Sequence, residues 1–134
     1  MNPFKFLLGS ATMPANLRSS LEAEGITFLA EGLTGSITYR NYKAPGKRYG
    51  IAKQGTAGAI GISGQRLVVW VSRGGYVDVP LAMVGSAVQA SADQPDRVSF
   101  SYDAGRFRPE TSGQVEIRLK TPQAAQIMNL INTA

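Results

Sequence analysis

The sequence predicts a mainly β protein of the α+β kind, in which about seven short antiparallel strands are closed by a C-terminal helix, with a short N-terminal helix before them. Apolar and polar residues alternate with the two-residue period of strands in several separate segments. Fifteen glycines and seven prolines are spread along the 134 residues and keep these segments short. Apolar residues recur at helical spacing only near the two ends. An all-helical bundle is therefore disfavoured.

Two short helices are expected, one near each end of the chain. The first spans 14–25, where Leu17 and Leu21 share one face. The second follows Thr121-Pro122, which places a hydroxyl at the N-cap and a proline at the first helical position. Its apolar residues fall at i, i+3, i+4 and i+7, namely Ala124, Ile127, Met128 and Ile131. This amphipathic helix should plug an open end or a face of the sheet.

The strands are expected between these helices. Leu67–Val71 is a continuous apolar, β-branched run, which predicts a strand buried on both faces with Trp70 in the core. Pro45-Gly46 predicts a turn over 44–48, and the polar stretch 91–97 predicts a loop. The remaining strands are predicted at 26–30, 37–40, 55–63, 76–81, 98–102 and 115–119.

Length and composition indicate one folded domain. The chain is 43% hydrophobic and 17% charged, which is the balance of a globular protein and not of a disordered one. We divide it into an N-terminal arm, 1–13, and a single domain, 14–134. The apolar cluster of the arm is too short for a signal peptide or a membrane span. One shared core is expected to contain Trp70, Phe100, Ile117, Ile127 and Ile131.

The absence of cysteine and histidine removes whole classes of chemistry. Disulfides, thiolate nucleophiles, Cys/His zinc sites and histidine general bases are impossible. No carboxylate pair stands in a catalytic motif, and no cofactor fingerprint is present. We therefore expect a protein that is not an enzyme and that needs no cofactor or metal. A chain without cysteine is compatible with the reducing cytoplasm, which is the location we expect, and also with export from a bacterium. If the protein binds lipid, it would lie at the periphery of the membrane.

One part of the chain carries a family resemblance. In Gly58–Trp70, a small-residue apolar strand leads through Ser63–Leu67 into a second apolar strand. This resembles the bacterial pleckstrin-homology-like and GRAM-like domain family, whose pattern there is T-x-x-R-L, although a serine stands where threonine is usual. Tyr76–Leu81 resembles that family's next strand. The resemblance implies a pleckstrin-homology-like barrel or sandwich, a binding or scaffold role and a raised chance of homo-oligomers. We expect Arg66 to cap the turn or to pair with Asp78.

Charge is distributed unevenly along the chain. The segment from Gly32 to Val77 holds seven basic residues and no acid, while all nine acids lie outside it. Such a segment gives a positive potential that attracts phosphate or carboxylate. Phosphoinositide binders of the resembled family place basic residues in an early loop between strands, and Lys43–Arg48 resembles that arrangement. The candidate ligand-binding residues are Arg40, Lys43, Lys47, Arg48 and Lys53.

Several functional interpretations follow from these patterns. The basic segment either keeps a small protein of net charge +5 solvated or binds anionic lipid or a phosphorylated ligand. Alternatively, the chain is a structural module that self-associates or binds a protein partner through the small-residue strand 55–61, the arm and an exposed sheet edge. Tyrosines interleave with the basic residues, as a surface that stacks on bases would require. Nucleic acid is nevertheless disfavoured as a ligand, because no recognised RNA-binding or DNA-binding motif is present.

Overall fold

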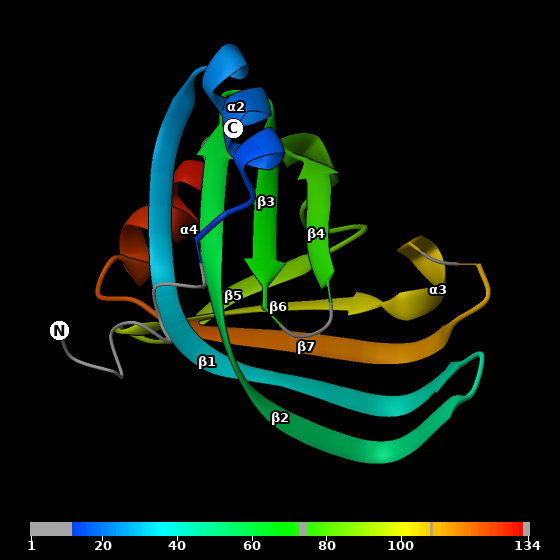
Figure 1. Ribbon diagram of the computed structural model, residues 1–134. Helices are drawn as coiled ribbons and strands as arrows, with labels where there is room; N and C mark the ends of the chain where they lie inside the picture. The colour runs from blue at the N-terminus through cyan, green and yellow to red at the C-terminus, as the bar shows by residue number, and fades with distance from the viewer. Residues whose placement is uncertain (1–11, 73–74, 108, 133–134) are drawn as a thin grey trace, which may run out of the picture.

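The structure, a computed structural model, describes residues 12–72, 75–107 and 109–132; most of the predicted arm, 1–11, lies outside the described residues. Seven antiparallel strands form one sheet in the order β4-β3-β2-β1-β7-β6-β5, which curls into a half-barrel (Figure 1). In chain order the elements are α2 (Ala15–Glu24), β1 (Ile26–Ala44), β2 (Lys47–Ser63), β3 (Arg66–Val71), β4 (Gly75–Pro80), the 3-10 turn η1 (Leu81–Met83), β5 (Gln89–Gln94), β6 (Arg97–Asp103), α3 (Ala104–Phe107), β7 (Ser112–Lys120) and α4 (Ala124–Asn132).

The long strands β1 and β2 join the two halves of the half-barrel. The end of β2, from Gly58 to Ile62, pairs with β3, which in turn pairs with β4. The later part of β1 pairs with β7 from Gly35 onward, and β7 continues into β6 and β5. We call the half around β3 and β4 the upper half and the half around β7, β6 and β5 the lower half, as Figure 1 shows them. Both halves share the β1–β2 hairpin.

The two strands predicted at 26–30 and 37–40 are a single strand, so the prediction of a break between them is wrong. The glycines act inside β1 instead. The pairing register with β2 shifts between Ala30 and Leu33, and Gly32 has φ of 68°. At Gly35 a Cβ atom would lie 1.7 Å from the carbonyl oxygen of Arg118 on β7. Glycine therefore permits a bulge and a close approach of strands without ending the strand.

A second prediction fails in the region expected to be a loop, 91–97. Residues up to Gln94 belong to β5, and only Pro95 and Asp96 form the turn into β6. This strand lies at the outside of the sheet order, where polar side chains face solvent and leave no apolar alternation to detect. The predicted total of seven strands is confirmed, although two predicted strands merge and one strand was not predicted.

The inner face of the sheet carries the main core. Phe100 and Ile117 are fully buried there, and α4 contributes Ile127 and Ile131, as predicted. Thr121 Oγ1 accepts a hydrogen bond from the backbone N–H of Gln123 (3.2 Å), as a capping hydroxyl would, but α4 begins at Ala124, so the predicted start at Pro122 is two residues early.

The placement of Trp70 in this core is wrong. In β3 the side chains that enter the main core are Leu67, Val69 and Val71, so alternation turns Val68 and Trp70 to the outer face of the sheet. Val68 is buried there, but Trp70 is only half-buried.

Helix α2 covers part of the outer face. Its Leu21 and the preceding Met13 pack against Ala59 of β2 and Val68 of β3 in a second apolar cluster. Gly61 makes room for this contact, because a Cβ atom there would lie 2.6 Å from Leu21 Cδ1. The predicted helix over 14–25 is confirmed, and the following Gly25 has φ of 91°, which suits glycine.

Candidate anion-binding surface

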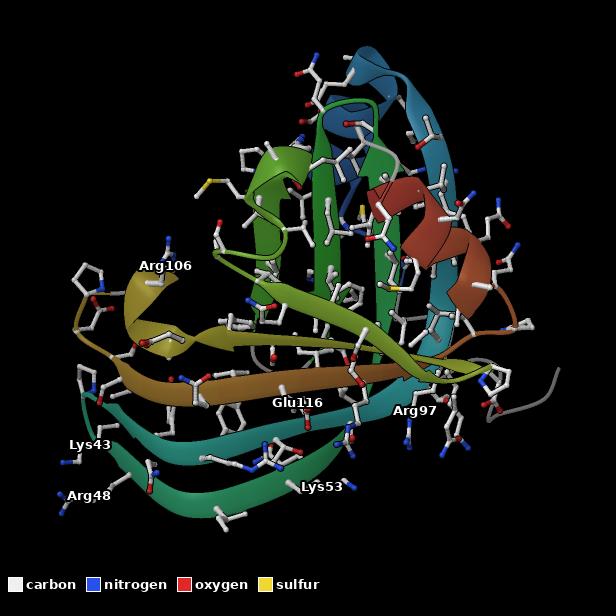
Figure 2. The ribbon with its side chains drawn as sticks, turned by 180° about the vertical axis from the view of Figure 1, so that it is seen from behind. Lys43, Arg48, Lys53, Arg97, Arg106 and Glu116 are labelled. Carbon is white, nitrogen blue, oxygen red and sulfur yellow. The ribbon has the colours of Figure 1, made fainter. Side chains whose placement is uncertain are left out.

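The tip of the β1–β2 hairpin brings two cations together. Pro45 and Gly46 form its turn, with φ of 76° at Gly46, which a glycine adopts without strain. Lys43 and Arg48 are directly paired across the two strands, and both are exposed. Figure 2 shows them side by side at the end of the hairpin. Like charges placed opposite each other disfavour strand pairing, so an anion bound between them would relieve a repulsion.

The other candidate residues lie elsewhere on the hairpin. Lys53 is five residues along β2 from Arg48, or about 16 Å at the rise of a strand (Figure 2). Arg40 pairs with Ile51 on the neighbouring strand. Lys47 begins β2, and its side chain lies outside the described part of the structure. The structure therefore brings Lys43 and Arg48 together but places Arg40 and Lys53 apart from them.

In the fold, the acid-free segment of the sequence lies beside an acidic residue of β7, Glu116. Glu116 pairs with Thr38, which on its other side pairs with Lys53, so the three side chains form a row across the sheet. Glu116 Oε1 lies 3.8 Å from Arg40 Nη1 and 3.0 Å from Arg118 Nη2. Arg40 is thus partly neutralised. No ion pair of Lys43, Arg48 or Lys53 occurs among the described side chains. The hairpin tip is therefore the place where two described cations of the candidate set lie together with their charges unpaired, while Lys53 is a single unpaired cation farther along β2.

Arg66 is held in a network that ties α2 to the sheet. Arg66 Nη1 donates to Asp78 Oδ2 at 2.6 Å, and Arg66 Nε lies 2.9 Å from Glu24 Oε2. Arg66 Nη2 also contacts Ser20 Oγ. The expected pairing with Asp78 is confirmed. Because two carboxylates already hold this guanidinium, Arg66 adds little to the positive surface of the basic segment.

Ser63 completes the Arg66 network by capping the turn into β3. Its hydroxyl donates to Glu24 Oε1 at 2.8 Å and accepts from the backbone N–H groups of Gln65 and Arg66. The hydrogen bond from Ser63, followed by Arg66, lowers the pKa of the Glu24 carboxyl. Burial alone would lower the pKa of Arg66, but hydrogen bonds to Asp78 and Glu24 outweigh it and raise that pKa.

The part that α2 plays in this network was not predicted from the sequence. A shallow depression of about 390 Å³ lies beside it, lined by Ser20, Glu24, Gln65, Arg66, Asp78 and Pro80. Its charged groups bond one another, which indicates a structural role. In the sequence, Ser63 indicates a capped turn, because it stands three residues before Arg66. Ser20 and Glu24 are distant from Arg66 in the sequence, and only the fold brings them into contact with it.

Two further observations bear on what the chain binds. Within the described ranges, no group of three or more histidine, cysteine, aspartate or glutamate side chains is placed to hold a metal ion. No helix in the same part of the chain is long and apolar enough to cross a membrane.

Comparison with known proteins adds no family. No protein-family model matches the chain, and no curated protein matches it significantly. The function of the chain is therefore inferred from the geometry of the basic hairpin.

Proposed function

We propose that this chain is a non-enzymatic binding module of the pleckstrin-homology-like class, and that the tip of its β1–β2 hairpin binds a phosphate group on an anionic membrane or a phosphorylated ligand. The observation that carries the proposal is the exposed pair Lys43 and Arg48, which face each other across the hairpin without an ion pair among the described side chains. Lys47 adds a third cation in the sequence at the same turn.

The energetics favour weak, salt-sensitive binding at this tip. A basic residue near an anionic membrane contributes about 1 kcal/mol, so three residues acting together are needed for measurable attachment. Screening lengths of about 8 Å at physiological ionic strength weaken such contacts when salt is added. The hairpin tip lies at one end of the sheet, where Lys43 and Arg48 are exposed, so it can reach a flat surface without rearrangement of the core (Figure 1).

Self-association is the competing function, because an antiparallel sheet with open ends has free edges. The edge formed by the first part of β2 carries Arg48 and Lys53, and two copies paired there would bring these cations into one narrow interface. With a net charge of +5 on each copy, this pairing is disfavoured. The geometry therefore supports an anionic ligand better than a second copy.

Vesicle co-sedimentation tests the proposal. The protein should bind vesicles that contain anionic lipid at low salt, bind them less at physiological salt, and leave neutral vesicles unbound. A variant with Lys43→Glu, Lys47→Glu and Arg48→Glu should lose binding. A control with Arg106→Glu, Lys120→Glu, Gln123→Glu and Gln126→Glu, all exposed positions, changes the net charge equally and should keep most of it. Competition with soluble inositol phosphate distinguishes recognition of a phosphate group from attraction to a charged surface. Equal loss in both variants, or no binding by the parent at low salt, would reject the hairpin tip as the site.

A further inference from the structure

A long stretch of β2 has a partner on one side only. From Lys47 to Thr56 this strand pairs with β1, and its pairing with β3 begins at Gly58. The carbonyl of Ala57 accepts from the backbone N–H of Ser72, so the covered region starts there. No other strand in the described ranges pairs with β2 before that point. Figure 1 shows this part of β2 as the outermost strand of the lower half.

The free edge is open to the approach of another backbone. At Gly50 and Gly55 nothing lies within 4 Å of the position that a Cβ atom would take. An edge strand presents the N–H and C=O groups of alternate residues outward, and these can pair with an added strand. At Gly50 and Gly55 the faces of the strand are also uncovered, so an added strand would meet no covering atoms at these two points.

The side chains along this edge combine one aliphatic residue with cations. Ile51 is 79% exposed, which is unusual for a large aliphatic side chain in this structure. Lys53, two residues later, projects from the same side of the strand, and Arg40 is directly across from Ile51 on β1. A strand laid along β2 would meet an apolar side chain and a cation at successive same-side positions.

We propose that the free edge of β2, from Arg48 to Thr56, binds an extended acidic segment of another protein as an additional strand. Main-chain hydrogen bonds would supply part of the affinity, and alternate side chains would supply the specificity. A β-branched residue of the partner would cover Ile51, and a carboxylate two residues away would pair with Lys53. The cations that disfavour a second copy of this chain attract such a segment.

This inference is separate from the proposed hairpin-tip function, because it depends on Ile51, Lys53 and the backbone of β2 and does not require Lys43. Binding to a membrane and binding to a peptide can therefore succeed or fail independently. The most informative variant is Lys53→Glu, an exposed change outside the triple variant used with vesicles. Arg106→Glu is its matched control, because Arg106 is also exposed and lies on α3, away from this edge (Figure 2).

The test is fluorescence anisotropy with a labelled peptide, Glu-Thr-Glu-Thr-Val-Thr-Glu-Thr-Glu, at low salt. A second peptide, Glu-Pro-Glu-Pro-Val-Pro-Glu-Pro-Glu, keeps the charge but lacks alternate N–H donors. We expect the first peptide to bind the parent at least about tenfold more tightly than the second, and Lys53→Glu to weaken binding by about tenfold relative to Arg106→Glu. Hydrogen exchange should slow at residues 48–56 when the first peptide is added.

Three results would overturn the inference. Equal affinity for the two peptides would show attraction by charge without strand pairing. Protection of β4 or β5 in place of residues 48–56 would assign the peptide to a different edge. A concentration-dependent dimer, seen by light scattering without peptide and lost in Ile51→Glu, would show that a second copy occupies the edge.

Discussion

The outer face of the sheet is apolar where α2 packs on the upper half and mainly polar in the lower half, although β1 and β2 run through both. Under α2, Ala59 and Val68 are buried against Leu21. In the lower half the same face carries Thr38 and Ser99, with Glu116 and Arg118 beside them. The residue types on the outer face therefore follow what covers that part of the sheet and change partway along a single strand.

The inner face does not show this difference, because one apolar cluster lines both halves. Ile117 of β7 is fully buried in it, so Ile117→Ala should lower the free energy of unfolding by about 2–5 kcal/mol. Ile51→Ala is the matched control: the same atoms are removed from a side chain that is 79% exposed, and the change should stay within about 0.5 kcal/mol. Urea denaturation measures both. Similar losses in the two variants would contradict the assignment of the faces.

The contact between α2 and the upper half can be tested at one glycine. Gly61→Val places a branched side chain where Leu21 Cδ1 is 2.6 Å and Met13 Cε is 3.1 Å from the Cβ position, so we expect a loss of about 1–3 kcal/mol as α2 is displaced. Gly55→Val, on the same strand in the lower half, meets nothing within 4 Å and should be neutral or stabilising. Thermal melts of the pair provide the measurement. A well-tolerated Gly61→Val would show that α2 is not packed on this strand.

The smallest expected effect concerns acid stability of the upper half. The hydrogen bond from Ser63, together with Arg66, holds the pKa of Glu24 below its usual 4.5. A carboxyl with a lowered pKa stabilises the folded state above its unfolded pKa, and this contribution is lost as the pH falls through the folded pKa. We expect Glu24→Gln to be less stable than the parent at neutral pH and the difference to shrink below about pH 4.5.

Melting curves between pH 3 and 7 measure this difference. Glu22→Gln, in the same helix, is the control, since its side chain is 57% exposed and pairs only with Arg18 among the described contacts. A difference between Glu24→Gln and the parent that does not change with pH would indicate lost packing and not lost charge.

The elements that follow a regular period were predictable from the sequence, because each is covered on one side only. Alternation located β6 and β7, and helical spacing located α2 and α4. The ion pair of Arg66 with Asp78 was also predicted correctly, since a tight hairpin brings adjacent strands together and Asp78 lies diagonally across from Arg66. These features depend on contacts that are local in the chain.

The failures come from contacts that are distant in the chain. Trp70 stands in an apolar run, and only the position of α2 shows that its face is incompletely covered. The glycines of β1 resemble a break in the pattern, because the strand that approaches Gly35, β7, lies near the other end of the sequence. Strand pairing likewise decides that Lys53 lies apart from the hairpin tip and that Glu116 lies beside Arg40. Charge runs in sequence therefore overstate how concentrated the charge is in space.

The pairing of Gly35 with Leu119 has a consequence for the order of events during synthesis. The β1–β2 hairpin contains its own turn and can form as soon as it leaves the ribosome, whereas β7 is made only after β3, β4, β5 and β6. Until then the later part of β1 remains an open strand edge, and the apolar side chains of the inner face remain exposed to solvent. A pause in translation before β7 would prolong this state, and we expect it to favour aggregation, because β7 closes the open edge of β1.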